Sequence, residues 1–435
     1  MTATAGGAGE TRLGPRAILR IPDFRRLWVA QSISDIGDGL TNLTLLLVVI
    51  RLTGSTAALA LMAIALAVPA IIVGPISGVF VDRWDRRRVM LVADLLRAAL
   101  VLGFLVVRSA DEVWILYLLG VAHASVGTFF TPARTALVPR VVPAGGLMAA
   151  NSLNQITRVI AGVLGASAAG VLVGVADVTW PAFVVDAGTF IVSFLFVSRV
   201  TTGGRPTGEG HLAGGGVFDS LREGLAIVAH SRILVGTMVG AGVTMLGLGA
   251  VNVLFIPLMI HELGVPATWL GVADIAQTAS MILAAGTVAV LAARLRPTSL
   301  VVVGLAGIAV IIGLVGGVSS VWQVAGLMFA VGWFVTPLEA SLMTIVQTTT
   351  GDSHRGRIAA TLHAVMAAAS VTSMGLAGVF ADVIGVRLVF VLAGVVVGVA
   401  AIAAALLFRG VRHGAVTSQA AHDMREPAVS GRPAS

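Results

Sequence analysis

The sequence of 435 residues contains no cysteine and no lysine. Without cysteine, the chain can form neither a disulfide nor a metal site with thiolate ligands. Without lysine, it cannot contain the phosphate-binding loop of ATP-driven pumps, whose lysine contacts the nucleotide. Charged residues are scarce as well, at 11% of the chain, whereas a soluble domain contains about 25%. So few charges cannot cover a surface that faces water, which excludes a soluble protein.

Apolar residues replace the missing charge and make up 57% of the chain. They are gathered in about twelve runs, each near the roughly 20 residues that cross a bilayer as a helix. Continuous runs favour helices over a β-barrel, in whose strands apolar and polar residues alternate. The predicted fold class is therefore an all-α integral membrane protein with twelve transmembrane helices. The predicted spans are 27–50, 56–81, 89–107, 113–133, 148–174, 179–198, 233–260, 268–293, 299–318, 321–345, 358–381 and 383–408.

Arginine supplies all 28 basic residues, and 23 of them lie in the two tails or in every second gap between the apolar runs. Because basic loops stay on the cytoplasmic side of a cell membrane, this pattern predicts that both termini are cytoplasmic. The net charge of +7 then lies beside the membrane, which indicates anionic lipid headgroups as partners rather than nucleic acid. The first apolar run is of span length and begins only near Leu27, so no cleavable signal peptide is expected.

The longest gap divides the predicted helices into two sets of six. It is rich in Gly and Thr and is interpreted as a cytoplasmic linker. Phe130-Thr131-Pro132 at the end of the fourth span has a counterpart, Val335-Thr336-Pro337, in the tenth, and such duplication is typical of secondary transporters. The predicted divisions are a tail at 1–26, six-helix halves at 27–198 and 233–408, the linker at 199–232 and a tail at 409–435.

The loop after the second span contains the sharpest motif of the chain. It begins with Gly78, continues with Asp82-Arg83 and ends in Arg86-Arg87-Arg88. This spacing resembles the G-x-x-x-D-R-x-G-R-R loop signature of the major facilitator superfamily, except that Asp85 stands where the signature has Gly. The loop therefore predicts a transporter of that superfamily.

Two further stretches, Asp35-Ile-Gly37-Asp38 and Asp186-Ala-Gly-Thr-Phe190, resemble the branch that holds the enterobactin exporter, macrolide efflux proteins and related drug exporters. The resemblance covers residues 20–408. It implies two pseudo-symmetric six-helix halves and a monomer that transports a small molecule without cofactor or metal. Two exporter motifs are degenerate: His123 stands where proton–drug antiporters have Arg, and Gly165-Ala166 replaces Gly-Pro in span five. These departures leave the fold untouched but weaken the case for proton antiport.

Ionisable residues inside the spans are the main functional candidates, because a charge at mid-bilayer costs roughly 2.5 kcal/mol or more. Asp38 and Arg158 fall near mid-depth on spans one and five, which are neighbours in this superfamily. We expect them to face the central cavity and to influence each other, either as a proton- or substrate-responsive pair or as a static one. Asp35 lies one turn before Asp38, so either the two carboxylates share a proton or Asp35 faces cytoplasmic water.

Two more residues complete the predicted proton-coupling set. Glu339 on span ten corresponds in the repeat to Arg134 on span four, and it serves either proton coupling or a gate salt bridge. His123 either titrates around pH 6.5 or is a buried core histidine. Asp186 is assigned to packing because span six usually faces away from the cavity, and Asp274 on span eight is a weaker candidate near the outer surface.

The predicted conformational gate lies at the cytoplasmic end of the first half. Asp94 and Arg97 are three residues apart on span three, close to the loop rich in arginine. We expect them to form a structural or gating pair with Asp82 and the loop arginines, which locks spans together and breaks during the conformational switch. The predicted gate residues are Gly78, Asp82, Arg83, Arg86, Arg87, Asp94 and Arg97.

The substrate cavity is predicted to be lined by spans one, four, seven and ten. These spans carry uncharged hydrogen-bonding side chains and adaptable apolar ones, although each residue alone is also explained by lipid contact or core packing. The candidates are Gln31, Asn42, Asn252, Phe129, Phe130, Met245 and Trp333.

The leading hypothesis is a secondary transporter that exports an amphipathic small molecule, such as a drug, a macrolide-like compound or a siderophore. Export would use proton antiport and alternating access, and the cavity charges favour a cationic or zwitterionic substrate. The alternatives are an importer or lipid transporter of the same fold, and a membrane sensor that does not transport. An enzyme is not expected, because the chain contains no H-E-x-x-H motif and no cysteine nucleophile.

Overall fold

The computed structural model describes residues 13–175, 178–204, 222, 225–229, 231–349 and 352–409. Within these ranges the chain forms twelve helices that are long and apolar enough to cross a membrane, and it forms no strand. The all-α fold class is therefore confirmed. Residues 1–12, most of the predicted linker and all but one residue of the predicted C-terminal tail lie outside the described residues.

The long helices follow one another along the chain with short connections, several of which contain a single helical turn. The long helices are α2 (Pro22–Thr53), α3 (Thr56–Arg83), α4 (Arg86–Gly103), α5 (Val113–Val141), α6 (Leu147–Val175), α7 (Trp180–Ser198), α9 (Arg232–Pro257), α10 (Thr268–Arg294), α11 (Pro297–Val315), α12 (Val321–Thr349), α13 (Asp352–Ile384) and α14 (Val386–Phe408). The short ones are α1 (Pro15–Ile18), η1 (Phe104–Val106), η2 (Ala110–Glu112), η3 (Ala144–Gly146) and η4 (Leu258–Glu262).

Helix ends are set by residues outside the apolar runs, so most helices are longer than predicted. α2 begins at Pro22, because proline at the first helical position has a suitable φ and lacks only an N–H that would be unpaired there. It ends before Gly54, whose φ of 63° is a conformation that glycine adopts without strain. α4 begins after Asp85, whose carboxylate accepts a hydrogen bond of 3.1 Å from the Arg88 N–H. The departure of Asp85 from the superfamily signature thus supplies a helix cap.

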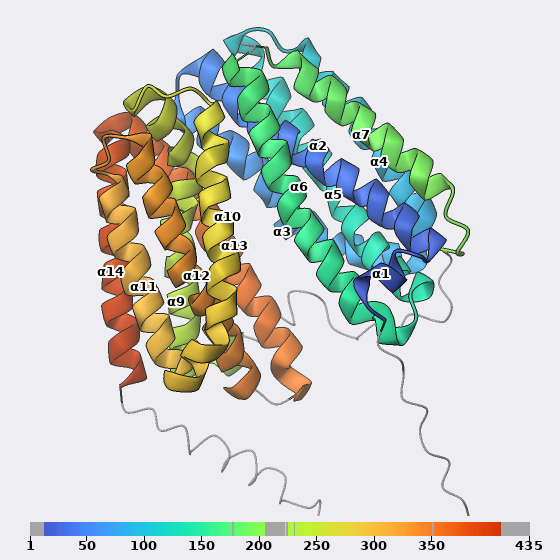
Figure 1. The fold of residues 1–435 in the computed structure, drawn as a ribbon. Coiled ribbons are helices and arrows are strands. Elements are labelled where there is room, and N and C mark those ends of the chain that lie inside the picture. The colour runs from blue at the N-terminus through green and yellow to red at the C-terminus, as the bar shows by residue number, and fades with distance from the viewer. Residues whose placement is uncertain are drawn as a thin grey trace, which may run out of the picture.

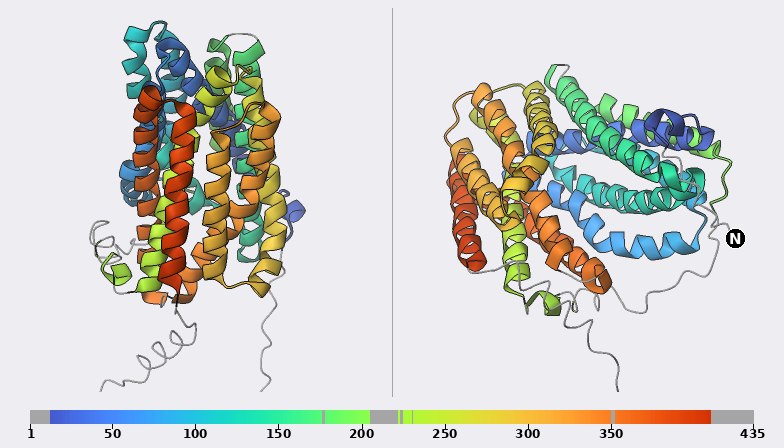
Figure 2. Two further views of the ribbon diagram at one scale, coloured as in Figure 1. Left: turned by 90° about the vertical axis from the view of Figure 1, so that its left-hand side faces the viewer. Right: turned by 60° about the horizontal axis from the view of Figure 1, so that its bottom comes forward.

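The helices form two sets of six with the same packing pattern (Figures 1 and 2). In the first set α2 packs on α6 and α7, α3 packs on α5, and α4 packs on α5 and α7. The second set repeats these pairs, since α9 packs on α13 and α14, α10 on α12, and α11 on α12 and α14. Two pairs, α3 with α13 and α6 with α10, join the sets. We call α2–α7 the first half and α9–α14 the second half.

The two halves meet closely at the end of the molecule that lies away from Leu13 and Arg409, the first and last described residues. There Gly378 on α13 is so close to α3 that a methyl group in its place would lie 2.3 Å from the Cβ of Ala60. Gly170 on α6 approaches the backbone of Ala267, before α10, in the same way. Asp382 near the end of α13 accepts hydrogen bonds from the first turn of α3. We call this the far end; the halves diverge toward the opposite end (Figure 1).

Candidate functional site

A cavity of about 860 Å³ among the described residues is lined entirely by the first half, and we call it the larger cavity. Its wall is formed by α2, α3, α4, α5 and α6, and α3 contributes mainly small apolar side chains such as Ala63, Ala67 and Ala70. The ionisable residues on this wall are Asp35, Asp38, Arg97, His123, Arg134 and Arg158. The cavity therefore combines an apolar side with a strongly charged one.

Arg97 on α4 is the centre of the charged side. It is only 7% exposed and forms an ion pair with Asp38 on α2. His123 on α5 places its Nε2 3.5 Å from the Asp38 carboxylate and 3.4 Å from the Arg97 guanidinium. The guanidinium also stacks 4.3 Å above the ring centre of Phe190 on α7, a contact that favours a buried cation. Side chains from three other helices thus hold this arginine in place.

Two further carboxylates are buried beside this arginine. Asp94, one turn before Arg97 on α4, accepts a hydrogen bond of 2.8 Å from the Ser193 hydroxyl. Asp186 on α7 accepts one of 3.0 Å from the Thr189 hydroxyl and is close enough to Arg97 to interact with it electrostatically. Both acids are fully buried, and each has one oxygen without a hydrogen-bond partner among the described residues. We call Asp38, Asp94, Arg97, His123 and Asp186 the Arg97 cluster.

The second cavity lies between the halves and has a volume of about 290 Å³. Asn42 on α2 lines both cavities and so marks where they adjoin. Polar groups from the second half face it as well, namely Asn252 on α9 and Asp274 and Gln277 on α10. It is the smaller, less charged part of the site.

The chain matches a family model described as transmembrane secretion effector over residues 13–432. The chain belongs to this family of the major facilitator superfamily. With its twelve membrane-spanning helices, it is an integral, multi-pass membrane transporter, as the loop motif predicted. Proteins of this kind are generally not enzymes.

The relatives of this transporter include exporters. It is 27% identical over 387 residues to YfiS, an uncharacterized MFS-type transporter of Bacillus subtilis, with 85% of this chain and 89% of the relative covered. It is 27% identical over 349 residues to the enterobactin exporter EntS of Citrobacter koseri, with 78% and 80% covered. The branch predicted from the sequence is therefore confirmed.

Solved structures of similar fold include the nucleoside transporter NupG, with a TM-score of 0.72 and 11% identity over 89% of this chain and 100% of that one. A bacterial homologue of the lysosomal transporter Spinster has a TM-score of 0.69 and 14% identity, and 88% and 96% of the two chains are covered. At these identities the likeness concerns the fold alone.

The structure does not place the predicted pair of Asp38 and Arg158 in contact. Asp38 is paired with Arg97 instead, because the packing of α2, α4, α5 and α7 brings this arginine inward. Arg158 of the transporter also lines the larger cavity but donates its hydrogen bond to Gln155 at 2.8 Å. Asp38 and Arg158 thus line the same cavity, and their influence on each other stays a prediction.

The remaining proton-coupling candidates are dispersed. Asp35 lines the cavity and accepts a hydrogen bond of 3.0 Å from Gln31 one turn earlier. His123 is buried within the Arg97 cluster. Glu339 on α12 is exposed and lines neither cavity, so the structure does not join it to the other candidates.

Three of the predicted substrate residues line a cavity, namely Asn42, Asn252 and Phe130. Gln31 is buried next to Asp35. The other three, Phe129, Met245 and Trp333, line neither cavity. Trp333 is 38% exposed, because the side of α12 on which it lies is not covered by other helices.

Asp94 and Arg97, the predicted gate pair, are not bonded to each other, because each has another partner. Asp94 is bonded to Ser193 and Arg97 to Asp38, because side chains on α7 and α2 lie closer to each than they do to one another. The surroundings of Gly78 and of the Asp82 side chain lie outside what the structure describes, and Arg83 is exposed. The loop arginines make their contacts within the first half.

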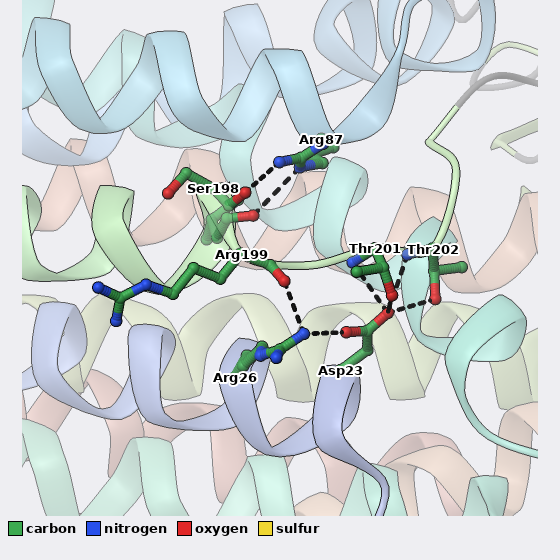
Figure 3. Close-up of polar contacts among 8 residues, drawn as sticks. Asp23, Arg26, Arg87, Ser198, Arg199, Thr201 and Thr202 are labelled. Atoms are coloured by element: carbon green, nitrogen blue, oxygen red, sulfur yellow. Dashed lines mark hydrogen bonds and ion pairs between the residues drawn. The ribbon is translucent and has the colours of Figure 1, made fainter.

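These loop contacts hold the end of α7 and the start of the linker (Figure 3). Arg87 donates hydrogen bonds to the carbonyls of Val197 and Ser198, and the N–H of Arg86 donates to Gly204 at 3.1 Å. They bind parts of one half to each other, so the described contacts of Arg86 and Arg87 do not cross between the halves.

Asp23, at the start of α2, reinforces the same region (Figure 3). Its carboxylate accepts four hydrogen bonds of 2.7–3.0 Å from the N–H and hydroxyl groups of Thr201 and Thr202. It also pairs with Arg26 at 2.8 Å, and Arg26 donates to the Arg199 carbonyl. We call this region, Asp23 with residues 199–204, the linker anchor.

Sequence reasoning missed the position of Asp186, which it assigned to packing. The available signal was Gly37, one residue before Asp38. A methyl group at Gly37 would lie 2.0 Å from an oxygen of Asp186, so the glycine lets α7 approach α2 and brings Asp186 to the Arg97 cluster. A glycine between two acids on one span was the clue that another buried polar group lies against it.

Proposed function

We propose that this transporter exports an amphipathic small molecule across the cell membrane in exchange for protons, by alternating access of its cavities to the two sides. Export is supported by the secretion family and by the enterobactin exporters among the relatives. The arginine pattern of the loops favours termini on the cytoplasmic side. The end of the molecule that is open then faces the cytoplasm, where an exporter takes up its substrate.

Alternating access is supported by the type of contact between the halves at the far end. These contacts are close approaches of glycines, one carboxylate, Asp382, on the first turn of α3, and a few apolar side chains of the first half, such as Ala60, that join the core of the second half. Contacts of this kind can separate without unfolding either half, because most helix packing lies within one half or the other and the first half also has apolar clusters of its own. Rocking of one half against the other about a central site is the movement expected of repeated transporter folds.

Proton exchange rests on one observation, the composition of the Arg97 cluster. Two buried carboxylates, Asp94 and Asp186, and the half-buried Asp38 surround a single buried arginine. A buried charge needs a partner, and one guanidinium can balance one carboxylate. Asp38, Asp94 and Asp186 are therefore the groups best suited to hold and release protons. Protonation of Asp38 would weaken its pair with Arg97 and loosen α2 from α4, which links proton binding to the movement of helices.

The experiment uses everted membrane vesicles from a bacterial host deleted for its own drug exporters. Respiration acidifies the vesicle interior, and an acridine dye reports the pH difference as compounds from a panel of macrolides, dyes and catecholate siderophores are added. A transported compound should partly collapse the pH difference in vesicles with the wild-type protein. Asp38→Asn should abolish this response, whereas Asp111→Asn, at an exposed acid in η2, should retain it.

Two results would overturn the proposal. The first is that no compound of the panel changes the pH difference or its own accumulation, which would favour a sensor. The second is that a compound is exported equally well after the gradients of pH and potential have been dissipated with ionophores. Movement of a compound out of the everted vesicles, instead of into them, corresponds to import into the cell and would favour an importer.

A further inference from the structure

The wall of the larger cavity carries three charges that do not belong to the Arg97 cluster. They are Asp35 on α2, Arg134 on α5 and Arg158 on α6. The three interact with one another electrostatically, and the two arginines repel each other. Two cations thus face one anion on this part of the wall, which leaves one positive charge in excess.

Neither arginine has a carboxylate partner within 4.0 Å among the residues that the structure describes. Arg158 donates to the uncharged Gln155. Arg134 is half-buried and makes no side-chain hydrogen bond in the same residues. Asp35, the nearest acid, already accepts a hydrogen bond from Gln31. Arg134 is partly withdrawn from water without a full counter-charge, which is unfavourable, and Arg158 is exposed on the cavity wall. An anion that entered the cavity would therefore find two guanidinium groups without a carboxylate partner.

The chemistry of guanidinium defines the group that fits. Arginine binds carboxylate, phosphate and similar oxyanions through parallel hydrogen bonds, and it does so more strongly where water is excluded. Another part of the cavity wall is formed by Ala63, Leu66, Ala67 and Ala70 on α3, which can receive an apolar body. A molecule with an acidic group at one end and an apolar body at the other would satisfy both sides.

We propose that Arg134 and Arg158 form an anion-binding subsite and that the substrate of this transporter is an amphipathic acid. That the bound acid is a substrate rests on the proposed function, whereas anion binding itself does not require transport. It reverses the expectation of a cationic or zwitterionic substrate. Asp38 is already neutralised by Arg97, and Asp35 is outnumbered by the two arginines, so the wall offers no free carboxylate to a cation.

The test compares two probes that share the same aromatic rings. 1-Anilinonaphthalene-8-sulfonate carries one anionic group, and N-phenyl-1-naphthylamine is its neutral parent. Binding to the purified full-length protein in detergent is followed by energy transfer from the seven tryptophans to the probe. Partition into detergent is the same for every variant, so differences between variants report the site.

Arg134→Gln and Arg158→Gln should each weaken sulfonate binding at least tenfold, which corresponds to about 1.4 kcal/mol, and should leave binding of the neutral probe unchanged. Asp35→Asn should strengthen sulfonate binding, because it removes the competing anion. Arg108→Gln, at an exposed arginine at the far end, is the matched control and should change neither probe. Arg158→Lys, which keeps the charge, should retain most of the sulfonate affinity.

Equal affinity of the wild-type protein for the two probes would overturn the inference, as would sulfonate binding that is unaffected by both arginine variants. If Arg134→Gln fails to fold and loses both probes, the other two variants still test the inference. Sulfonate binding should weaken in Arg158→Gln and strengthen in Asp35→Asn. The vesicle assay separates the two proposals. Binding of the sulfonate without proton-linked transport refutes only the proposed function, and proton-linked export that ignores the charge of the compound refutes only the subsite.

Discussion

Asp382 is predicted to hold the halves together at the far end, and its removal should shift the conformational balance of the transporter. The carboxylate lies on α13 and accepts hydrogen bonds of 2.8 Å from the Ser55 hydroxyl, 2.8 Å from the Thr56 N–H and 3.1 Å from the Ala57 N–H. These are donors at the N-terminus of α3, so an acid of one half caps a helix of the other. The contact exists only while the far end is closed.

The magnitude follows from the contacts that are lost. Removal of a helix cap costs about 1 kcal/mol, and a negative charge at a helix N-terminus contributes roughly 0.3–1 kcal/mol. Ser55 remains as a cap, since its hydroxyl accepts from the Ala58 N–H at 3.2 Å, and Asp382 is exposed to solvent, so we expect about 1 kcal/mol in total. Asp382→Ala should therefore raise the ratio of far-end-open to far-end-closed molecules by about fivefold.

The absence of native cysteine makes the measurement direct. Spin labels are placed on Met148→Cys in α6 and Arg296→Cys after α10, which are both exposed at the end opposite the far end. Pulsed electron double resonance then measures the distance between the two halves at that end. Asp382→Ala should increase the short-distance population, because opening of the far end closes this one. Glu262→Ala, which breaks an ion pair of 2.9 Å with Arg387 inside the second half, should not. An unchanged distance distribution in Asp382→Ala, or an equal change in Glu262→Ala, would refute the reasoning.

Three further predictions concern the first half. Gly37→Ala should lower the free energy of unfolding by about 1–3 kcal/mol, because its methyl group would lie 2.0 Å from Asp186 and 2.3 Å from Thr189. The change should appear as a lower melting temperature in detergent. An unchanged melting temperature would contradict the close approach of α2 and α7. Asp23→Ala should release the linker anchor and speed hydrogen exchange at residues 201 and 202, whose N–H groups it binds; exchange equal to that of the wild type would show that the anchor does not need the carboxylate. Arg97→Gln should abolish proton-linked transport, since the three carboxylates around it would lose the arginine that balances their charge; retained coupling in the vesicle assay would remove Arg97 from the mechanism.

The fold was predictable because it follows from one-dimensional patterns. Apolar runs of span length, and arginines in alternate gaps, are visible without any knowledge of packing. Helix ends were less predictable, because α2 continues to Pro22 and Thr53 through polar residues that a hydropathy pattern excludes. The cap at Asp85 shows the same limit, since it appeared in the sequence only as a departure from a motif.

The sequence predicted which residues belong to the site better than it predicted which of them contact one another. Asp38 and His123 were singled out, but the arginine between them was assigned to a gate, because spacing along α4 suggested Asp94 as its partner. Which face of α4 meets α2 depends on side-chain packing between helices, and a single sequence does not contain that information. Asp186 was overlooked for the same reason, and Arg134 was considered only as a counterpart of Glu339.

The exchange of substrate for protons through the Arg97 cluster is the central claim, and proteoliposomes test it most directly. Vesicles with the purified protein are loaded with a compound that responds in the vesicle assay and with a pH-sensitive dye, then diluted into buffer without the compound. The account predicts that outward flow of the compound acidifies the interior of wild-type vesicles and leaves the pH unchanged with Asp38→Asn. Flow of the compound from wild-type vesicles without acidification, or full acidification with Asp38→Asn, would contradict it.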